Sequence, residues 1–346
     1  MRPTPDFPTA PLSYLPIETP PPGEVTRVAE GVHWIRFPLP LDLDHINLWL
    51  IEHAGGFVLV DTGLASSAGR AAWERLEREV LASRPLRLIV VTHLHADHAG
   101  LAAWLQDRHQ VPVWTSRDTE RQIGQLFMRL SEAQLGERTA FLRRHGLTET
   151  EGFLPSLSGE RYRMVVSGVP QIAHRPEDGE EVTWEGSAWR WLATGGHAAG
   201  HLCLLEPVRG VLITGDQVLP AISPNVSLLE WGLDANPLDS YLRSLERLRS
   251  LDPATLVLPS HGRPFTGLRE RALVLTAHHE QRLERLLEAC REPSTAVECL
   301  RVLYRRSLIG FHLFLALGEA VAHLEYLALA GTLSRLTDER GLIRYV

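Results

Sequence analysis

A cluster of potential metal ligands directly follows an apolar, strand-like run. The run LRLIVVT is continuous, which is typical of a buried strand, and His93, His95, Asp97 and His98 follow it within six positions. Neutral imidazole and carboxylate are the usual donors to zinc and related ions. Four such side chains in one loop are costly to bury without an ion. The sequence therefore predicts a metal site at the end of this strand.

Three later segments repeat the order of a strand, a polar side chain and a nearby glycine. They offer His197 in AWRWLATGGHAAGH, Asp216 in LITGDQ and His261 in LVLPSHG. Glycine lets the backbone turn sharply beside a ligand. His201 is the main rival to His197, but we favour His197 because it follows its strand directly, whereas His201 opens the next strand. The repetition favours one shared site.

Strands and helices alternate along the chain in two rounds. In the first round, GVHWIRFPL, HINLWLIEH and FVLVD predict strands, and residues 66–82 have the apolar spacing of an amphipathic helix. A polar helical stretch over 117–145 and a loop-like stretch over 146–160 follow. The second round predicts a helix near 237–251 and strands at RYRMVV, EEVTW, AWRWLAT, HLCLLEP and GVLITGD. This order permits an α/β fold with two sheets between helices.

We expect three parts along the chain. Residues 1–23 form a proline-rich arm, residues 24–267 a catalytic domain, and residues 268–346 a helical, winged-helix-like domain with a helix over 311–330 and a hairpin around DERG. The insertion over 117–160 has no metal-binding pattern, which leaves the roles of a lid or an interface open. A helix in the C-terminal part could also bring His278 and His279 to the pocket.

Composition restricts the partners and the compartment. The net charge is −7 and all 35 basic residues are arginine, so no global basic field attracts nucleic acid, although a local basic groove stays open. The N-terminus lacks a secretory pattern, and no uninterrupted apolar run reaches membrane-spanning length. Three cysteines without ligand spacing suit a reducing compartment. We expect a cytoplasmic protein with a small-molecule substrate and no membrane contact; a homodimer is left open.

Together the motifs resemble the metallo-β-lactamase superfamily, which includes glyoxalase II-type thioesterases, lactonases, RNase Z-type nucleases and lactamases. The resemblance covers roughly residues 30–265, and His-X-His-X-Asp-His in THLHADHAG is its most specific part. FVLVDTG, TGGHAAGH, ITGD and PSHG match further motifs in the family's order. The resemblance implies a four-layer αββα sandwich. Gly196 departs from the family, where proline often precedes the third histidine.

The resemblance also implies a dinuclear site, with zinc as the first expectation and iron or manganese as alternatives. The ligands would be His93, His95 and His197 for one metal, Asp97, His98 and His261 for the other, and Asp216 as a bridge. Asp61 in FVLVDTG would accept the outer ring proton of a ligand histidine. A turn or helix cap is its alternative role.

Two ions roughly 3.5–4 Å apart can share a water, lower its pKa and polarise the scissile bond. In this chemistry Asp97 and Asp216 are the catalytic carboxylates, and Asp97 would pass a proton to the leaving group. We expect hydrolysis of a small ester, thioester or lactone. A nuclease acting on RNA or DNA and a mononuclear iron persulfide dioxygenase are the alternatives. A β-lactamase is less favoured because an export signal is missing from the N-terminal residues.

The segment before the second strand offers candidate substrate contacts. Asp44, His45 and Asn47 lie in a region that borders the active-site mouth in the superfamily that the chain resembles. Their alternative role is a polar turn that leads into the strand. The sequence leaves both roles open.

Overall fold

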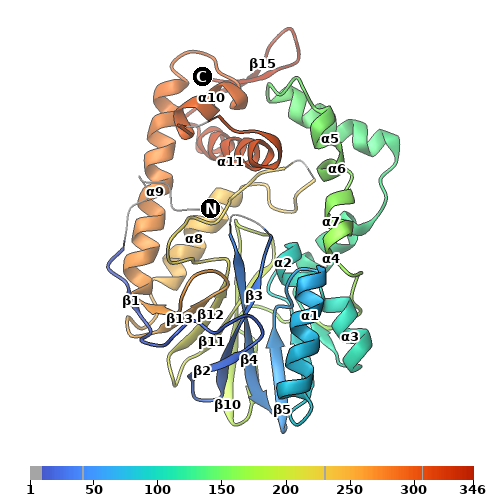
Figure 1. Cartoon of the computed structure of the whole chain (residues 1–346). Helices are drawn as coiled ribbons and strands as arrows, with labels where there is room; N and C mark the ends of the chain where they lie inside the picture. The colour runs from blue at the N-terminus through green and yellow to red at the C-terminus, as the bar shows by residue number, and fades with distance from the viewer. Residues whose placement is uncertain (1–9, 41–42, 230, 306) are drawn as a thin grey trace.

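Two seven-stranded sheets lie in the lower half of the molecule as drawn in Figure 1, below the helices of the C-terminal part. The computed structural model describes residues 10–346 except 41, 42, 230 and 306. The first sheet has the spatial order β2 (Val25–Ala29), β3 (Val32–Pro38), β4 (His45–His53), β5 (Gly56–Val60), β6 (Leu86–Val90), β7 (Val113–Trp114) and β8 (Ile172–His174). The second sheet has the order β1 (Ser13–Tyr14), β14 (Phe265–Thr266), β13 (Leu256–Pro259), β12 (Val211–Gly215), β11 (His201–Glu206), β10 (Ser187–Thr194) and β9 (Glu181–Trp184).

The two sheets pack face to face, and helices cover the outer face of each. Between the sheets lies a core that includes Trp34, Trp49 and Trp191. The outer face of the first sheet packs against α1 (Ser67–Leu76) and α3 (Ala102–His109). The outer face of the second packs against α8 (Pro237–Leu248) and the first half of α9 (Leu268–Ala289). The predicted αββα sandwich is therefore confirmed.

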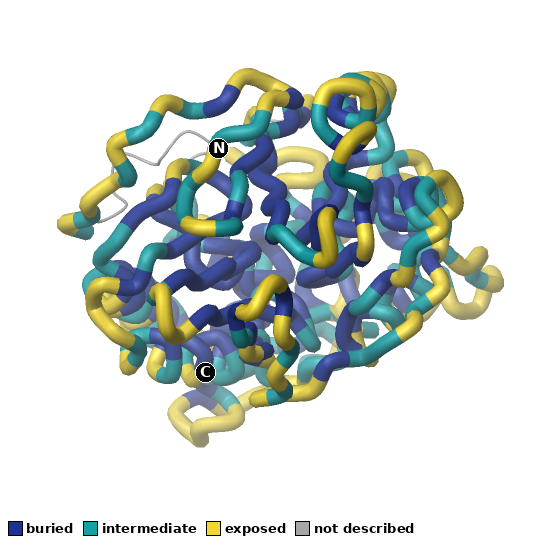
Figure 2. Tube along the Cα trace, turned by 90° about the horizontal axis from the view of Figure 1, so that it is seen from below, coloured by how far each residue is buried: buried dark blue, intermediate teal, exposed yellow. Residues whose placement is uncertain are grey.

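Local sequence explains the elements that lead to the site. The middle of β4 is buried, as expected for the largely apolar sequence HINLWLIEH. Figure 2 shows that buried segments lie in the interior of the molecule and exposed segments lie mainly around its outside. β5 and β6 are parallel and are therefore joined by a helical crossover. That crossover begins at α1, where the hydroxyl oxygen of Ser66 caps the helix by accepting a hydrogen bond from the backbone N–H of Gly69. A short π-helical segment, η1 (Glu77–Leu81), continues it.

The strand predicted at RYRMVV is wrong, because these residues form α7 (Glu160–Val165). Gly159, at φ +73°, turns the chain into this helix, and the hydroxyl of Tyr162 donates to the carbonyl of Leu94 at 2.7 Å. One edge of the first sheet is formed instead by β8, which the sequence analysis did not predict, and the other edge is β2. The rest of the insertion contains α4 (Arg117–Phe127), α5 (Glu132–Arg144), η2 (Glu151–Phe153) and α6 (Leu154–Leu157).

The C-terminal part contains the second half of α9, α10 (Ala296–Leu303), α11 (Gly310–Leu329) and a hairpin of β15 (Arg335–Thr337) with β16 (Ile343–Tyr345). Its core also includes Phe141 and Phe153, so the insertion packs against these helices. α9 belongs to both the sandwich and the C-terminal part. Its residue Leu275 packs with α8 on the sandwich, whereas Leu286 packs in the C-terminal core. The domain limit at residue 268 stays a prediction.

Among the described residues, α11 is the one helix long and apolar enough to cross a membrane by length and composition. Its most apolar window is 61% buried inside the protein. α11 contributes Leu317, Val321 and Leu324 to the C-terminal core, as expected for a helix at the centre of a folded unit. At the N-terminal end, β1 pairs antiparallel with β14; residues 1–9 of the predicted arm lie outside the described residues.

Candidate metal centre

The candidate ligands lie in four loops at one end of the sandwich. Each loop follows the carboxyl end of a strand: β6 leads to the His93–His98 segment, β10 to His197, β12 to Asp216 and β13 to His261. Within the first loop, His95 precedes the short helix α2 (Ala96–Ala99). The structure brings all seven candidate side chains together in two adjoining groups. Because these strand ends belong to both sheets, the sandwich itself sets the position of the site.

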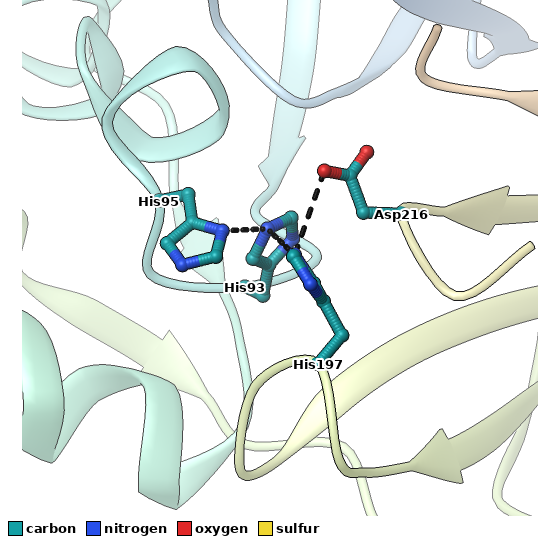
Figure 3. A group of neighbouring side chains, drawn as sticks. All are labelled: His93, His95, His197 and Asp216. Atoms are coloured by element: carbon teal, nitrogen blue, oxygen red, sulfur yellow. Dashed lines mark hydrogen bonds and ion pairs between the residues drawn. The ribbon is translucent and has the colours of Figure 1, made fainter. Parts of the chain in front are cut away.

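The first group contains His93, His95, His197 and Asp216 (Figure 3). Nε2 of His93 lies 3.0 Å from Nδ1 of His95 and 3.2 Å from Nε2 of His197. Nε2 of His197 lies 3.5 Å from Oδ2 of Asp216. One ligand atom from each residue can thus face a common centre, since these atoms lie within 4.8 Å of one another.

The second group contains Asp97, His98 and His261. Nε2 of His98 and Nε2 of His261 each lie 3.4 Å from Oδ1 of Asp216. Nε2 of His261 also lies 3.4 Å from Oδ2 of Asp97. The two oxygens of Asp216 therefore face different groups, which is the geometry that a bridging carboxylate needs.

Two buried atoms indicate whether a metal ion fits between the two ligand groups. Nε2 of His98 and Oδ1 of Asp216 are buried and lie 3.4 Å apart, yet neither makes a hydrogen bond. A buried polar atom without a partner costs about 1–3 kcal/mol, and a divalent ion between these groups would satisfy both. The donor set of imidazoles and carboxylates suits zinc. The residues present thus fit divalent metal ions.

Four histidine rings are held from behind by hydrogen-bond acceptors at Nδ1, which leaves Nε2 facing the centre. These pairs are His93 with Thr92 Oγ1 (3.0 Å), His98 with Asp61 Oδ2 (2.7 Å), His197 with the Asn225 carbonyl (2.8 Å) and His261 with the His45 carbonyl (2.7 Å). Such acceptors fix the tautomer and orientation of a metal-binding imidazole. Four of the five candidate histidine ligands are therefore oriented before any ion binds.

Asp61 supports the centre from the end of β5. Its carboxylate accepts a hydrogen bond from His98, and also from the backbone N–H of Thr92 at 2.8 Å. The residue is 1% exposed and has φ +63°, a conformation that is uncommon outside glycine. The alternative role of a helix cap does not apply, because Ser66 caps α1.

Burial and mutual charge set the pKa values at the centre. Burial, together with the neighbouring histidines, lowers the pKa of His93 well below its ordinary value. Burial opposes the charged form of Asp97, but His98 and His261 lower its pKa to about 2. Burial also opposes the charged form of His261, whereas Asp216 and Asp97 raise its pKa to about 9. The carboxylates are thus anionic at neutral pH and attract a cation.

Of the two roles left open for Asn47, the structure supports a structural role and argues against contact with substrate. Asn47 is 0% exposed, and its amide donates to the carbonyls of Pro259 and Gly262, both at 2.8 Å. Its oxygen accepts from Trp34 Nε1 at 2.8 Å. Asn47 therefore holds the loop that carries His261.

His45 also holds the loop that carries His261. Its Nε2 accepts from the backbone N–H of Gly262 at 2.7 Å, and its Nδ1 donates to Asp44 at 2.6 Å. Both ring nitrogens are thus occupied by the protein. The carboxylate of Asp44 is 78% exposed, so its predicted contact with substrate stays a prediction.

His201 lies beside the centre and outside both ligand groups. Its ring is fully buried, packs against His93 at 4.9 Å between centroids, and accepts from the backbone N–H of Asp216. His279 pairs with His323 between α9 and α11, and His278 lies beside Arg282. Neither His278 nor His279 joins the two groups.

The structure explains the glycine that replaces proline before His197. Gly196 has φ +93°, whereas proline is fixed near φ −65°. A Cβ here would lie 2.3 Å from Cβ of Tyr241 and 2.4 Å from the carbonyl of Pro237. The loop therefore packs so closely on α8 that glycine is required.

Two supporting residues were missed by sequence reasoning. Thr92 lies between Asp61 and His93 and bonds to both, and its position between the strand and His93 was a usable signal. Asn225 reaches His197 only through its backbone carbonyl, so its side chain gave no signal.

Comparison with known proteins agrees with this architecture. The model of the metallo-beta-lactamase superfamily matches residues 41–261, and that of the metallo-beta-lactamase-like C-terminal domain matches residues 283–346. The crystal structure of a beta-lactamase domain protein from Burkholderia ambifaria is 38% identical, with a TM-score of 0.87, covering 97% of this chain and 98% of that one.

Two curated relatives carry functional names. The probable metallo-hydrolase YqjP from Bacillus subtilis is 29% identical, covering 86% of this chain and 92% of the relative. The acyl-coenzyme A thioesterase MBLAC2 from Bos taurus is 26% identical, covering 69% of this chain and 80% of the relative. With its sandwich, its ligand loops and the family match over residues 41–261, the chain belongs to the metallo-beta-lactamase superfamily and is a metal-dependent hydrolase.

Proposed function

We propose that this hydrolase cleaves a small ester, thioester or lactone at a dinuclear metal centre, with an acyl thioester as the first candidate substrate. The observation that carries the proposal is the position of Asp216, whose oxygens face two separate ligand groups at 3.4 and 3.5 Å. Divalent ions held by the two ligand groups would supply a water of lowered pKa and would polarise the scissile carbonyl. Neither a serine nor a cysteine nucleophile is required.

The protein's own carboxylates handle the proton. Asp97 lies beside His261 in the second group, with its pKa lowered to about 2 by His98 and His261 against the effect of burial. Asp97 is thus anionic at neutral pH, and its position in the second group would let it accept the proton of the attacking water and deliver it to the leaving sulfur or oxygen. Water adds to the carbonyl, and the bond from carbon to the leaving atom breaks.

The overall charge of the chain favours a substrate that is not a polyanion. The net charge is −7, whereas a polyanionic backbone is usually bound by arginine or lysine. The thioesterase activity in the name of the MBLAC2 relative adds support for a thioester.

A hydrolysis screen tests this function. The purified, zinc-loaded protein is assayed on acyl thioesters, lactones, simple esters, phosphodiesters and RNA, alongside Asp97→Ala and Asp107→Ala. Asp107 is an exposed carboxylate on α3 and serves as the matched control. We expect acyl-thioester hydrolysis that falls by at least about 100-fold in Asp97→Ala and is unchanged in Asp107→Ala.

Other outcomes of the same screen would overturn the proposal. Turnover of RNA or phosphodiesters alone would assign the centre to a nuclease. Activity that survives Asp97→Ala would contradict the role given to that carboxylate. Metal analysis of protein purified without added metal separates two zinc ions from the single iron of a persulfide dioxygenase.

A further inference from the structure

The loop from residue 217 to residue 229, which begins directly after Asp216, is attached to the C-terminal helices. From α9, the Arg271 guanidinium donates to the carbonyl of Leu219 at 2.6 Å and to that of Ile222 at 2.7 Å. Ser223 lies 3.4 Å from Nε2 of His279, also on α9. The backbone that follows Asp216 is thus fixed to a helix outside the two sheets.

The second half of this loop is attached to α11. The Asn225 side chain donates to the carbonyl of Leu315 at 3.4 Å, and the Ser227 hydroxyl lies 2.6 Å from Oδ1 of Asn225. The backbone N–H of Leu228 donates to the carbonyl of Gly318 at 3.0 Å. The side chain of Asn225 is therefore held by α11 and Ser227, and its backbone carbonyl can accept a hydrogen bond from another residue.

The approach of the loop to α11 requires a glycine on the helix. A Cβ at Gly318 would lie 2.7 Å from Oγ and 2.9 Å from Cβ of Ser227. Because Cβ atoms essentially never come this close to a neighbour, alanine at this position would push Ser227 and the adjoining loop away. Gly318 is thus a contact point between α11 and the loop.

Beyond its covalent start at Asp216, this loop contacts a ligand of the metal centre through the carbonyl of Asn225. The carbonyl of Asn225 accepts the Nδ1 proton of His197 at 2.8 Å, which orients Nε2 of that ring toward His93 and Asp216. The second ligand group has different supports, because His98 is held by Asp61 and His261 by the His45 carbonyl, both from the first sheet.

We propose that the C-terminal helices set the affinity of one metal position only, the one that contains His197, by holding the Asn225 carbonyl in place. Ser227 and Gly318 are the positioning residues of this connection. The inference rests on the proposed dinuclear centre. It extends that proposal by giving a helical unit that contains none of the ligands a role in metal binding.

Metal affinity measured without substrate tests the connection. Zinc is titrated into metal-free protein in competition with a chromophoric chelator, for the parent, Ser227→Ala and Gly318→Ala. The control is Gly136→Ala on α5, where an added Cβ meets nothing within 4 Å. We expect one of the two dissociation constants to rise by about 10-fold or more in Ser227→Ala and Gly318→Ala, and neither to change in Gly136→Ala.

Cobalt absorption spectra identify the position that changes. His197→Ala and His261→Ala serve as references, each weakening one position of the centre. Ser227→Ala and Gly318→Ala should lose the same band intensity as His197→Ala at limiting cobalt. Ser227→Ala removes hydrogen bonds without adding bulk, so it keeps the test valid if Gly318→Ala does not fold.

The outcomes separate the two proposals. Two unchanged dissociation constants in both variants, with only the melting temperature altered, would overturn the connection and leave the dinuclear centre intact. Equal weakening of both positions would also overturn it, because the effect would then be general. A parent protein that binds no zinc would instead contradict the proposed function.

Discussion

The backbone N–H of Asp216 donates a hydrogen bond to Nε2 of His201 at 3.2 Å. The other ring nitrogen of His201 lies 3.0 Å from the hydroxyl of Thr194. The backbone at Gly215 passes so close that a Cβ there would lie 2.5 Å from the same Nε2 atom. The ring of His201 thus supports the backbone at Gly215 and Asp216. In this way it helps to position the Asp216 carboxylate between the two ligand groups.

Replacing His201 with alanine should weaken both the fold and the centre. The Asp216 N–H would lose its partner in a buried site, so we expect the free energy of unfolding to fall by about 1–3 kcal/mol. Zinc affinity should fall at both positions, because Asp216 faces both groups. Urea unfolding and chelator competition measure the two effects. An unchanged affinity at either position would show that the carboxylate does not depend on this support.

Asp61→Asn should weaken one metal position while retaining the fold. Asparagine keeps the shape of the side chain but removes the negative charge that accepts the proton of His98. Loss of such a partner typically lowers metal affinity by about 10–100-fold. Isothermal titration with zinc should show one weakened site of two. Two unweakened sites would limit Asp61 to a structural role.

Gly196→Ala should destabilise the protein, although alanine is the smallest side chain that can be added. Its Cβ would lie 2.3 Å from Cβ of Tyr241 in a loop with φ +93°. We expect a loss of about 1–3 kcal/mol in the free energy of unfolding, measured by urea denaturation. Gly136→Ala is the control and should match or exceed the stability of the parent. A parent-like Gly196→Ala would contradict the close packing on α8.

The free energy of unfolding should decrease as the pH falls, partly because of His323. Burial and the nearby Arg282 lower the pKa of His323 to about 3, whereas the unfolded chain has an ordinary histidine pKa of about 6.5. Between these values the unfolded state binds the additional proton, so stability is lost as the pH falls. His323→Gln should reduce the slope of unfolding free energy against pH by up to about 1.4 kcal/mol per unit. Equal slopes from about pH 6 to pH 4 would contradict this assignment.

Removing the metals should lower the melting temperature and leave a folded protein. Ions that bind only the native state stabilise it by mass action, by about 2.7 kcal/mol at 100 times the dissociation constant. Chelation should lower the melting temperature, and two equivalents of zinc should restore it. Differential scanning calorimetry measures both changes. Complete restoration by one equivalent would indicate a mononuclear centre.

Sequence patterns predicted the parts of the site that depend on the order of residues along a short stretch of the chain. Each candidate ligand lies in a loop that follows a strand, and the end of that strand fixes where the loop begins. His197 could be preferred over His201 on this ground, and the structure places His197 in a ligand group and His201 beside it. Asp61 was recognised through its motif after a strand.

The parts that were missed depend on contacts between distant segments. Asn47 was a candidate for substrate contact, yet its amide bonds to backbone atoms more than 200 positions away in the chain. The segment RYRMVV has strand-like residues, but Gly159 and the bond from Tyr162 to Leu94 place it in a helix. The contacts of Asn47 and the bond from Tyr162 to Leu94 join distant segments, so the periodicity of the local sequence could not reveal them.

The sharing of α9 between two cores has a mechanical consequence. A helix of 22 residues extends for roughly 33 Å, and its two halves are anchored at Leu275 and Leu286 in different bodies. Swinging the C-terminal unit as a hinged flap would require breaking this rod or unpacking one of its ends. Substrate entry and product exit should therefore proceed by rearrangement of loops, with the large bodies keeping a constant mutual orientation throughout turnover.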